Sequence, residues 1–537
     1  MRYKNSKYII VIPIIIAVSF WAGMFVNKTN YSIESVLSGG VQHTMPTNKI
    51  GAIMNMIHTS YVDSVNVDSL EESAINHLIK ELDPHTAYLT AKEMEKANEE
   101  LVGNFGGVGI QFYSFQDTIV VVNVIKNGPS ERAGILSGDR IIKVGDTVVA
   151  GVKYKTDNAM KLMRGEINTD VQLTIFRKTT GDTLVTKVTR GSIPVSSVPV
   201  SYMMNDTLGF IKVDFFGMQT YNEFIDGVNK LLRQGMTHLI VDMRGNGGGV
   251  MSIAVRMVNE FLPENRLILY TQGKSVPRSD YKSNGRGVYP ELPLTVLIDE
   301  SSASAAEIFA GALQDNDRAQ IIGRRSFGKG LVQEQCVLPD GSALRLTIAR
   351  YYIPSGRCIQ KPYELGEDGK KDYYMELMTR IEHGEFYQAD SVKFDESQKF
   401  ETLGGRTVYG GGGIMPDIFV PADTTNYTDY LYELVSKQHI YNYTFIFMDK
   451  HRSELVGKVA NWQELQEYLK QFDLVADVVA YAKKSGVPVN RKELEESRHI
   501  IRIMTEAHIA RHLFDNEGFY PIYDEIDTTL QQAIDLI

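Results

Sequence analysis

The sequence predicts a multidomain α+β protein, and three observations support this fold class. The chain has 537 residues, which fits three or four domains better than one. Its hydrophobic pattern changes from helical spacing to short strands, then to alternating strands and helices, and finally back to helices. Its 43% hydrophobic and 23% charged residues are an ordinary globular composition.

The first element is an apolar segment that begins at Tyr8, ends at Val26 and contains no charged side chain. Three basic residues precede it, namely Arg2, Lys4 and Lys7. Its length is close to the roughly 20 residues that span a bilayer, and it has no clean small-residue cleavage motif. We expect residues 1–31 to form a cytoplasmic tip and a transmembrane anchor, with the rest on the periplasmic side of the cytoplasmic membrane. The alternative is a cleaved signal peptide, which also exports the chain.

Residues 32–103 predict a helical lead domain. Apolar residues repeat at helical spacing over residues 50–61 and again over residues 70–82. Thr90 and Glu93 have the spacing of a capping box, which would start a third helix. A lead domain of this kind serves either as an oligomerisation element or as a simple spacer.

Residues 104–194 predict a small β domain of short strands. Residues 119–125 are rich in β-branched side chains, and residues 129–134 have the pattern of a short helix that ends at glycine. A glycine-dense loop leads into the first long strand of this domain and contains Gly106, Gly107, Val108, Gly109 and Ile110.

From residue 195 to residue 421, strands and helices alternate, which predicts an α/β layer fold. Residues 239–242 and 294–298 have the pattern of buried strands, and an alanine-rich helix is expected over residues 303–313. Residues 362–404 are charged and aromatic without a clear period. We interpret them as an insertion into the core.

Residues 422–537 predict a second helical domain. Asn461 with Glu464, and Asn490 with Glu493, have the spacing of capped helix starts. The pattern of this part indicates no catalytic constellation. Its helices are a second candidate for contacts in a homo-oligomer.

The charge and the cysteines restrict the partners and cofactors. The net charge of −10 and the pI of about 5.7 argue against a nucleic-acid partner, which needs a clustered basic excess. The two cysteines, Cys336 and Cys358, lack the spacing of a zinc site. A turn at Asp340-Gly341 would place Cys336 opposite a residue near Arg345. Two buried thiols are therefore the default and a disulfide the alternative, and no metal or cofactor is predicted.

Ser304 is the candidate nucleophile. It follows a predicted strand and begins a predicted helix, between small residues that let a substrate backbone approach. The helix N-terminus supplies partial positive potential, and the N–H group of Ala305 can help to hold an oxyanion. The structural alternative is a serine that only caps the helix.

Lys329 lies between two glycines and is the candidate general base. A base must be neutral near pH 7, which requires the lysine pKa to fall by about 3 units from about 10.4, at about 1.4 kcal/mol for each unit. Burial can supply such a shift. Gln333 lies four residues further on, where a strand would place it on the same face as Lys329 to orient the amine. The alternatives are an exposed turn lysine and a surface glutamine.

Residues 242–249 form a glycine-rich turn between a predicted strand and a predicted helix, and its N–H groups can contribute to an oxyanion site. The turn matches neither the P-loop nor the dinucleotide fingerprint. A serine–histidine–aspartate triad is the rival scheme. However, no G-x-S-x-G motif surrounds Ser304, and His43, His85 and His238 occur in unrelated contexts.

Seven stretches resemble the signature of the carboxy-terminal processing proteases, also called tail-specific proteases. Three belong to the catalytic core of that family: DMRGNGGG at 242–249, SSASAAE at 301–307 and RRSFGKGLVQ at 324–333. Four more surround them: LDPHTAYLT at 82–90, NGPSERAGILSGDRIIKVGD at 127–146, ARYYIPSGRCIQ at 349–360 and GGGGIMPDIFVP at 410–421. The resemblance covers roughly residues 50–360 and 405–421.

This resemblance implies a PDZ domain over residues 104–194, which selects protein substrates by their C-terminal tails, and a protease core with a crotonase-like fold. The implied site residues are the nucleophile Ser304, the base Lys329, the orienting residue Gln333, and the oxyanion donors Gly248 and Ala305. The tail would add as a strand, with its carboxylate in the glycine-dense loop and its side chain beside Val108 and Ile110.

Two departures from the family pattern leave the catalytic atoms in place. Ala306 stands where the family often has serine, and Gly247 stands where it often has proline. The PDZ segment ends in MRGEINT rather than in a longer glycine-threonine turn, which leaves a gating role for Arg164 open. The rival interpretations are a non-catalytic PDZ scaffold that binds tails and, more weakly, a hydratase-type crotonase.

Overall fold

The computed structural model describes residues 48–537, and the chain divides into two compact units, residues 1–77 and residues 78–537. The predicted anchor of residues 8–26 lies outside the described residues and stays a prediction. Within the described part, no helix is both long enough and apolar enough to cross a membrane.

The described part of the first unit is helical, as the apolar spacing predicts. Helix α2 (Lys49–Ser60) begins at Asn48, whose side chain accepts a hydrogen bond from the N–H group of Gly51. Helix α3 (Val67–Lys80) begins in this unit and ends in the second. The apolar side chain of Ile53 on α2 is 56% exposed.

The second unit begins with a strand that the sequence pattern did not predict. Strand β1 (Ala87–Leu89) pairs antiparallel with β18 (Ala343–Tyr352), so this part of the expected helical lead domain belongs to a sheet of the core. Helix α4 (Ala91–Val102) follows and starts with the predicted capping box of Thr90 and Glu93.

Residues 104–194 form the expected small β domain. Its strands are β2 (Asn104–Gly107), β3 (Ile110–Phe115), β4 (Thr118–Val124), β5 (Arg140–Val144), β6 (Thr147–Val148), β7 (Asp170–Arg177), β8 (Asp182–Thr189) and β9 (Gly191–Pro194). Its helices are α5 (Pro129–Arg132) and α6 (Thr156–Met163). One sheet has the order β3-β4-β5-β7-β8 with β6 beside β5, so β3 is an edge strand, and β2 pairs separately with β9.

The core contains a six-stranded sheet that is parallel except at one edge. Its order is β10 (Val200–Met203), β11 (Leu208–Lys212), β12 (His238–Asp242), β15 (Leu294–Ile298), β16 (Gln320–Gly323) and β21 (Ile418–Phe419), and only β10 runs antiparallel to its neighbour. The buried strands β12 and β15 lie where the apolar runs predict them.

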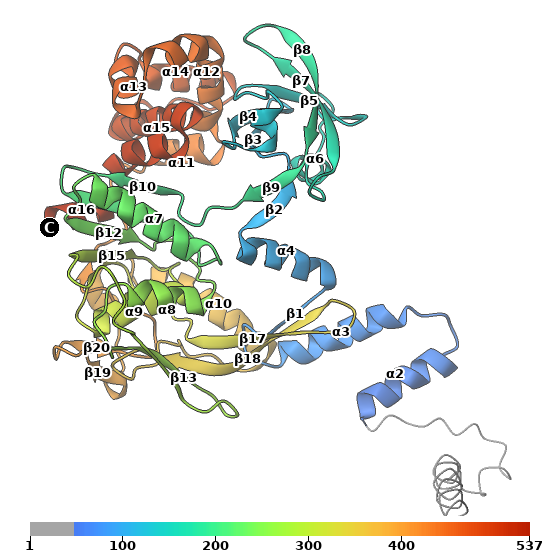
Figure 1. The fold of residues 1–537 in the computed structure, drawn as a ribbon, viewed down its shortest axis with the longest axis vertical. Coiled ribbons are helices and arrows are strands. Elements are labelled where there is room, and N and C mark those ends of the chain that lie inside the picture. Colours follow the sequence, from blue (N-terminus) through green and yellow to red (C-terminus); the bar gives the residue numbers. More distant parts are fainter. Residues whose placement is uncertain (1–47) are drawn as a thin grey trace, which may run out of the picture. The chain divides into compact units, whose positions relative to one another are not determined.

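Helices cover both faces of this sheet. One face packs against α7 (Thr220–Arg233), α8 (Met251–Asn259) and α9 (Ala305–Asp315), and α8 lies beside α9 (Figure 1). The opposite face packs against Leu530 and Ala533 of α16 (Thr528–Asp535), so the last helix of the predicted C-terminal domain completes the core.

A second sheet carries the loop of Lys329. It contains β1, β18, β13 (Leu267–Gln272) and β14 (Ser279–Lys282) in that order, with β17 (Leu331–Val337) also paired to β18. In the β17–β18 hairpin, Cys336 lies opposite Leu344, and both Cys336 and Cys358 are free thiols. Cys358 is partly buried but Cys336 is exposed, so the prediction of two buried thiols is wrong for Cys336, which lies in the outer part of the hairpin.

The insertion is more regular than its sequence indicates. It contains helix α10 (Gly366–Glu382), the short 3-10 helices η2 (Ala389–Ser391) and η3 (Glu396–Gln398), and a hairpin of β19 (Lys399–Glu401) and β20 (Thr407–Tyr409). Buried Tyr373 anchors α10, whose other apolar side chains, such as Met375, are largely exposed. This explains why the segment shows no clear apolar period.

The C-terminal part forms a helical bundle (Figure 1). Its helices are α11 (Asp429–Ser436), α12 (His439–Lys458), α13 (Trp462–Leu469), α14 (Leu474–Lys484) and α15 (Arg491–Tyr523), followed by η4 (Asp524–Ile526). Asn461 and Asn490 cap α13 and α15 as predicted. Asp515 interrupts α15 with φ 54°, which bends the helix at that residue.

Candidate active site

A cavity of about 790 Å³ in the core brings together all the predicted catalytic and oxyanion residues except Ala305. Its lining includes Ser304, Lys329, Gln333 and the glycines 247, 248 and 249. Apolar side chains such as Phe216 and Ile308 form part of its wall. Of the described residues that line it, none belongs to the β domain of residues 104–194.

Ser304 occupies a strained turn between β15 and α9. Its backbone has φ 55° and ψ −113°, a conformation that L-residues rarely adopt and that costs about 1–3 kcal/mol. The hydroxyl of buried Tyr351 donates a hydrogen bond to the carbonyl oxygen of Ser304 at 3.1 Å. Such a turn at the end of a buried strand presents the Ser304 side chain to the cavity.

The fully buried carboxylate of Glu307 links the serine turn to the lysine loop. Its Oε2 accepts hydrogen bonds from the N–H groups of Ser304 and Lys329, each at 2.8 Å. Its Oε1 accepts from Ser326 Oγ at 2.6 Å and from the N–H group of Gly328 at 2.7 Å. Burial raises the pKa of Glu307 to about 7, although these four hydrogen bonds act in the opposite direction.

Lys329 and Gln333 make the contact that their spacing predicts. Lys329 Nζ donates a hydrogen bond to Gln333 Oε1 at 3.2 Å. Burial lowers the pKa of Lys329, and the nearby charge of Arg345 lowers it further. Among the described residues, no hydrogen bond joins Lys329 Nζ to Ser304 Oγ. The two side chains share the cavity, and substrate would have to tighten their contact.

The loop before β1, which contains His85, holds the side chain of Gln333 in place. The sequence pattern did not predict this contact. Gln333 Nε2 donates to the carbonyl oxygen of His85 at 2.6 Å. His85 Nε2 in turn lies 2.9 Å from the hydroxyl of Tyr373 on α10. Burial and the charge of Lys329 lower the pKa of His85 to about 4, so its ring is neutral at neutral pH. His85 belongs to the stretch LDPHTAYLT, whose resemblance to the family was the only sign in the sequence that this segment lies near the site.

The two predicted oxyanion donors differ in their hydrogen bonds. The N–H group of Gly248 donates to Asn246 Oδ1 at 2.8 Å. No described residue accepts a hydrogen bond from the N–H group of Ala305. A Cβ on Gly248, which has φ 100°, would lie 2.7 Å from the Cβ of Ser304, so only glycine allows this close approach.

An ion-pair network fixes the start of the glycine-rich turn. Arg244 contacts Asp242 in the same turn through Nε at 2.8 Å and contacts Asp527, just before α16, through Nη2 at 2.6 Å. Lys212 Nζ lies 3.3 Å from Asp242 Oδ2. Although Asp242 is buried, Arg244 and Lys212 hold its pKa well below the usual range. The C-terminal segment therefore supports the turn that carries Gly248.

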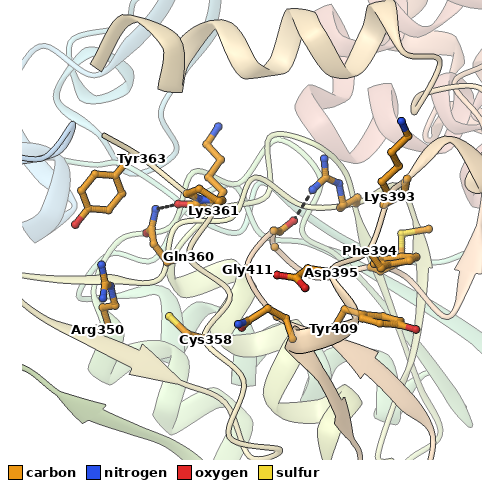
Figure 2. Close-up of a pocket in the computed structure, with 18 of the residues that line it drawn as sticks. Arg350, Cys358, Gln360, Lys361, Tyr363, Lys393, Phe394, Asp395, Tyr409 and Gly411 are labelled. Atoms are coloured by element: carbon orange, nitrogen blue, oxygen red, sulfur yellow. Dashed lines mark hydrogen bonds between the residues drawn. The ribbon is translucent and has the colours of Figure 1, made fainter. Parts of the chain in front are cut away.

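A second cavity, of about 600 Å³, lies between the core and the insertion (Figure 2). Phe394 stacks on Tyr409 with their ring centroids 4.3 Å apart, and Tyr363 lies on the opposite side (Figure 2). Gln360 in its wall accepts a hydrogen bond from the N–H group of Gly330 at 2.8 Å. The cavity thus lies behind the loop that carries the candidate base.

Two basic side chains of this second cavity already have acidic partners. Arg325 contacts Glu385 at 2.6 Å, and Lys361 contacts Glu376 at 2.9 Å. These pairs reduce the positive charge that the cavity could offer to an anionic ligand.

The predicted tail-binding residues fall into two environments. Gly106 and Gly107 belong to β2 and pair with β9, which gives them a structural role. Val108 is buried in the core of the β domain, Gly109 has φ 77°, and Ile110 begins the edge strand β3. The last three residues therefore lead directly into the strand whose open edge could accept a peptide.

Comparison with protein-family models assigns the parts of the chain. The model described as peptidase family S41 matches residues 207–368, and the model of the PDZ domain matches residues 106–188. A family of unknown function matches residues 430–515. The fold and the site thus define a peptidase of mixed helices and sheets with a PDZ domain.

Similar proteins give the same assignment. A carboxy-terminal-processing protease of Bartonella bacilliformis is 34% identical over 350 residues, which are 64% of this chain and 79% of the relative. A probable CtpA-like serine protease of Staphylococcus aureus is 33% identical over 314 residues, which are 58% of this chain and 62% of that protein. The chain belongs to the carboxy-terminal-processing proteases of peptidase family S41.

Two solved structures are also similar in part. The photosystem II D1 C-terminal processing protease is 25% identical with a TM-score of 0.33, covering 59% of this chain and 84% of that one. The tricorn protease is 16% identical with a TM-score of 0.31, covering 59% of this chain and 27% of that one. TM-scores of this size do not establish a common overall fold.

Proposed function

We propose that this chain is a serine endopeptidase of the Ser–Lys type that cleaves exported proteins and selects them by their C-terminal tails through the PDZ domain. One observation carries the catalytic part. Ser304 and Lys329 line one cavity, and one buried carboxylate accepts hydrogen bonds from the backbone N–H groups of both. This arrangement fixes the nucleophile relative to a lysine whose pKa burial has already lowered.

In the proposed reaction, neutral Lys329 takes the proton of Ser304 Oγ, and the alkoxide attacks the peptide carbonyl. The N–H group of Ala305 is available to the oxyanion, whereas that of Gly248 must first leave Asn246 Oδ1. The protonated lysine then gives its proton to the leaving amine. The same amine activates the water that hydrolyses the acyl-enzyme, and Gln333 orients it throughout.

A fluorophosphonate probe tests the nucleophile. It should label the wild-type chain at Ser304 and should not label Ser304→Ala. A non-catalytic scaffold that only binds tails predicts no labelling in either chain. A hydratase-type crotonase likewise predicts no labelling of Ser304. The largely parallel core sheet under α7–α9 remains compatible with the crotonase-like fold that the resemblance implies.

For tail selection, the supporting feature is the edge strand β3 and the loop that leads into it. A C-terminal peptide can add to such an edge through backbone hydrogen bonds. Substrates that end in apolar residues should be cleaved faster than the same sequences with amidated tails. A chain that lacks residues 104–191 but cleaves both kinds with the wild-type preference would rule out selection by this domain.

We also propose that residues 8–26 hold the chain in the cytoplasmic membrane with the core on the periplasmic side. The apolar composition of the segment and the basic residues before it support this. Protease added to intact spheroplasts should degrade the body of the chain, and its protection would contradict the proposal. N-terminal sequencing of the mature protein distinguishes an anchor from a cleaved signal.

The exposed Ile50 and Ile53 of α2 support a homo-oligomer through the lead helices.

A further inference from the structure

The C-terminal bundle buries one face of the PDZ sheet. Phe115, Val120 and Val122 of the PDZ domain form a cluster with Phe445 of α12, and each of the four is at most 6% exposed. The ring of Phe445 stacks on Phe115 at 5.3 Å and on Tyr113 at the same distance. Aromatic contacts of this size and burial are typical of a stable interface.

Charged groups frame this apolar contact. Asp449 of α12 lies 2.6 Å from Arg140 of β5 and 2.6 Å from Lys178, which follows β7. The side chains of Arg140 and Asp449 are only 14% and 16% exposed. The hydroxyl of Tyr113 also donates a hydrogen bond to Gln438 at the start of α12. One acidic residue of the bundle thus forms ion pairs with two basic residues of the PDZ domain.

The bundle contacts β3, the edge strand to which the C-terminal tail of a substrate is proposed to add. Ile110 and Phe112 of β3 pack on the core of the PDZ domain, whereas Tyr113 and Phe115 face α12. The contact therefore covers a face of β3 and leaves its edge unpaired by any described strand. No described residue of the PDZ domain lines the Ser304 cavity.

We propose that the helical bundle matched by the family of unknown function is a dock for the PDZ domain, which holds this domain clear of the Ser304 cavity with the edge of β3 open. The docking itself follows from the contacts of α12 with β3, β4 and β5. Its effect on cleavage rests on the function proposed above.

Hydrogen exchange of the full chain tests the docking. Asp449→Lys places a third positive charge between Arg140 and Lys178. It should speed exchange in β3 and β4 by about tenfold or more, because local opening becomes easier. Exchange in α6, whose Ala159 and Met163 pack in the core of the PDZ domain, reports on the integrity of this domain and should change far less.

Two further variants make this test specific. Glu454→Lys changes the charge of α12 equally but breaks only contacts outside the PDZ domain, such as those with Lys458 and His451 of the same helix, so it should leave exchange in β3 and β4 as in wild type. Combining Asp449→Lys with Arg140→Glu and Lys178→Glu restores the ion pairs with reversed signs and should restore protection. Wild-type exchange of β3 and β4 in both Asp449→Lys and Phe445→Ala would overturn the docking.

Cleavage of a substrate with a free tail tests the consequence. Asp449→Lys should lower the rate by about fivefold or more, with recovery in the triple variant and no loss in Glu454→Lys. Faster exchange with an unchanged cleavage rate would overturn the claim that docking keeps the cavity clear. If wild type and Ser304→Ala both fail to cleave any substrate, the proposed function fails, while the exchange result still decides the docking.

Discussion

The backbone N–H groups of Ser304 and Lys329 donate hydrogen bonds to the same oxygen atom, Oε2 of Glu307, at 2.8 Å each. The two residues come from different elements, the start of α9 and the loop before β17. A shift of either element would therefore stretch a hydrogen bond to a fully buried carboxyl group. This shared acceptor fixes the distance between the two backbones.

The first prediction concerns the base. Lys329→Ala should abolish cleavage while the chain stays folded, as should Ser304→Ala. Because only the neutral amine can accept the serine proton, wild-type kcat/KM should rise with pH through a lysine pKa below 10.5. Initial rates across a pH series measure this rise. Full activity in Lys329→Ala would exclude the Ser–Lys mechanism.

The second prediction concerns Glu307. Glu307→Gln replaces an oxygen that accepts hydrogen bonds with an amide group that donates them, so at least one of the four buried donors loses its partner. Each unmatched donor costs about 1–3 kcal/mol. Cleavage should fall by about tenfold or more, because the serine turn and the lysine loop shift apart. A Glu307→Gln chain with wild-type kcat/KM would show that the shared acceptor does not position the site.

The raised pKa of Glu307 gives this prediction a pH signature. The folded chain keeps the Glu307 proton up to about pH 7, whereas the unfolded chain loses it near 4.5. The contribution of this group to stability therefore falls as pH rises between these values. The difference in unfolding free energy between wild type and Glu307→Gln should be larger at about pH 5 than at about pH 8. Urea denaturation measures it, and an equal difference at both pH values would contradict the assignment.

The third prediction separates orientation from catalysis at Gln333. Gln333→Ala removes one hydrogen bond to Lys329 and should lower kcat by about tenfold or less. Gln333→Glu keeps an acceptor at this place but adds a negative charge, which raises the pKa of Lys329. Its pH–rate profile should therefore move to higher pH. An unshifted profile in Gln333→Glu would argue that the two side chains do not interact during the reaction.

The fourth prediction compares neighbouring glycines. Gly248→Ala should lower kcat/KM by about 100-fold, because its Cβ would collide with the Cβ of Ser304 at a left-handed backbone position. Gly247→Ala is the matched control, since a Cβ there meets no atom within 4 Å. It should keep nearly full activity. Equal activity losses in the two variants would indicate a general sensitivity of the turn.

Local chemistry made much of the fold predictable. The buried strands at 239–242 and 294–298 and the capping pairs of Thr90 with Glu93 and of Asn461 with Glu464 depend on neighbouring residues, and the structure has all of them. Strand β1 escaped prediction because three residues carry no periodic signal, and its partner β18 lies far along the chain.

The sequence indicated the candidate side chains of the site, but it did not indicate the residues that hold them in position. Local pattern and spacing made Ser304, Lys329 and Gln333 candidates, and the resemblance to the family decided in their favour. Glu307 looked like an ordinary residue of a helix start, because the groups that it binds become neighbours only after folding. The use of Asn246 as acceptor for Gly248 depends on a turn conformation that residue types alone do not specify.

The position of α16 has a consequence for the order of events during synthesis. The core sheet needs Leu530 and Ala533 to cover one face, and the glycine-rich turn needs Asp527 to hold Arg244. A ribosome must therefore synthesise the chain through α16 before either requirement is met. Until then, one face of the sheet stays uncovered and the turn that carries Gly248 lacks the ion pair that holds its start.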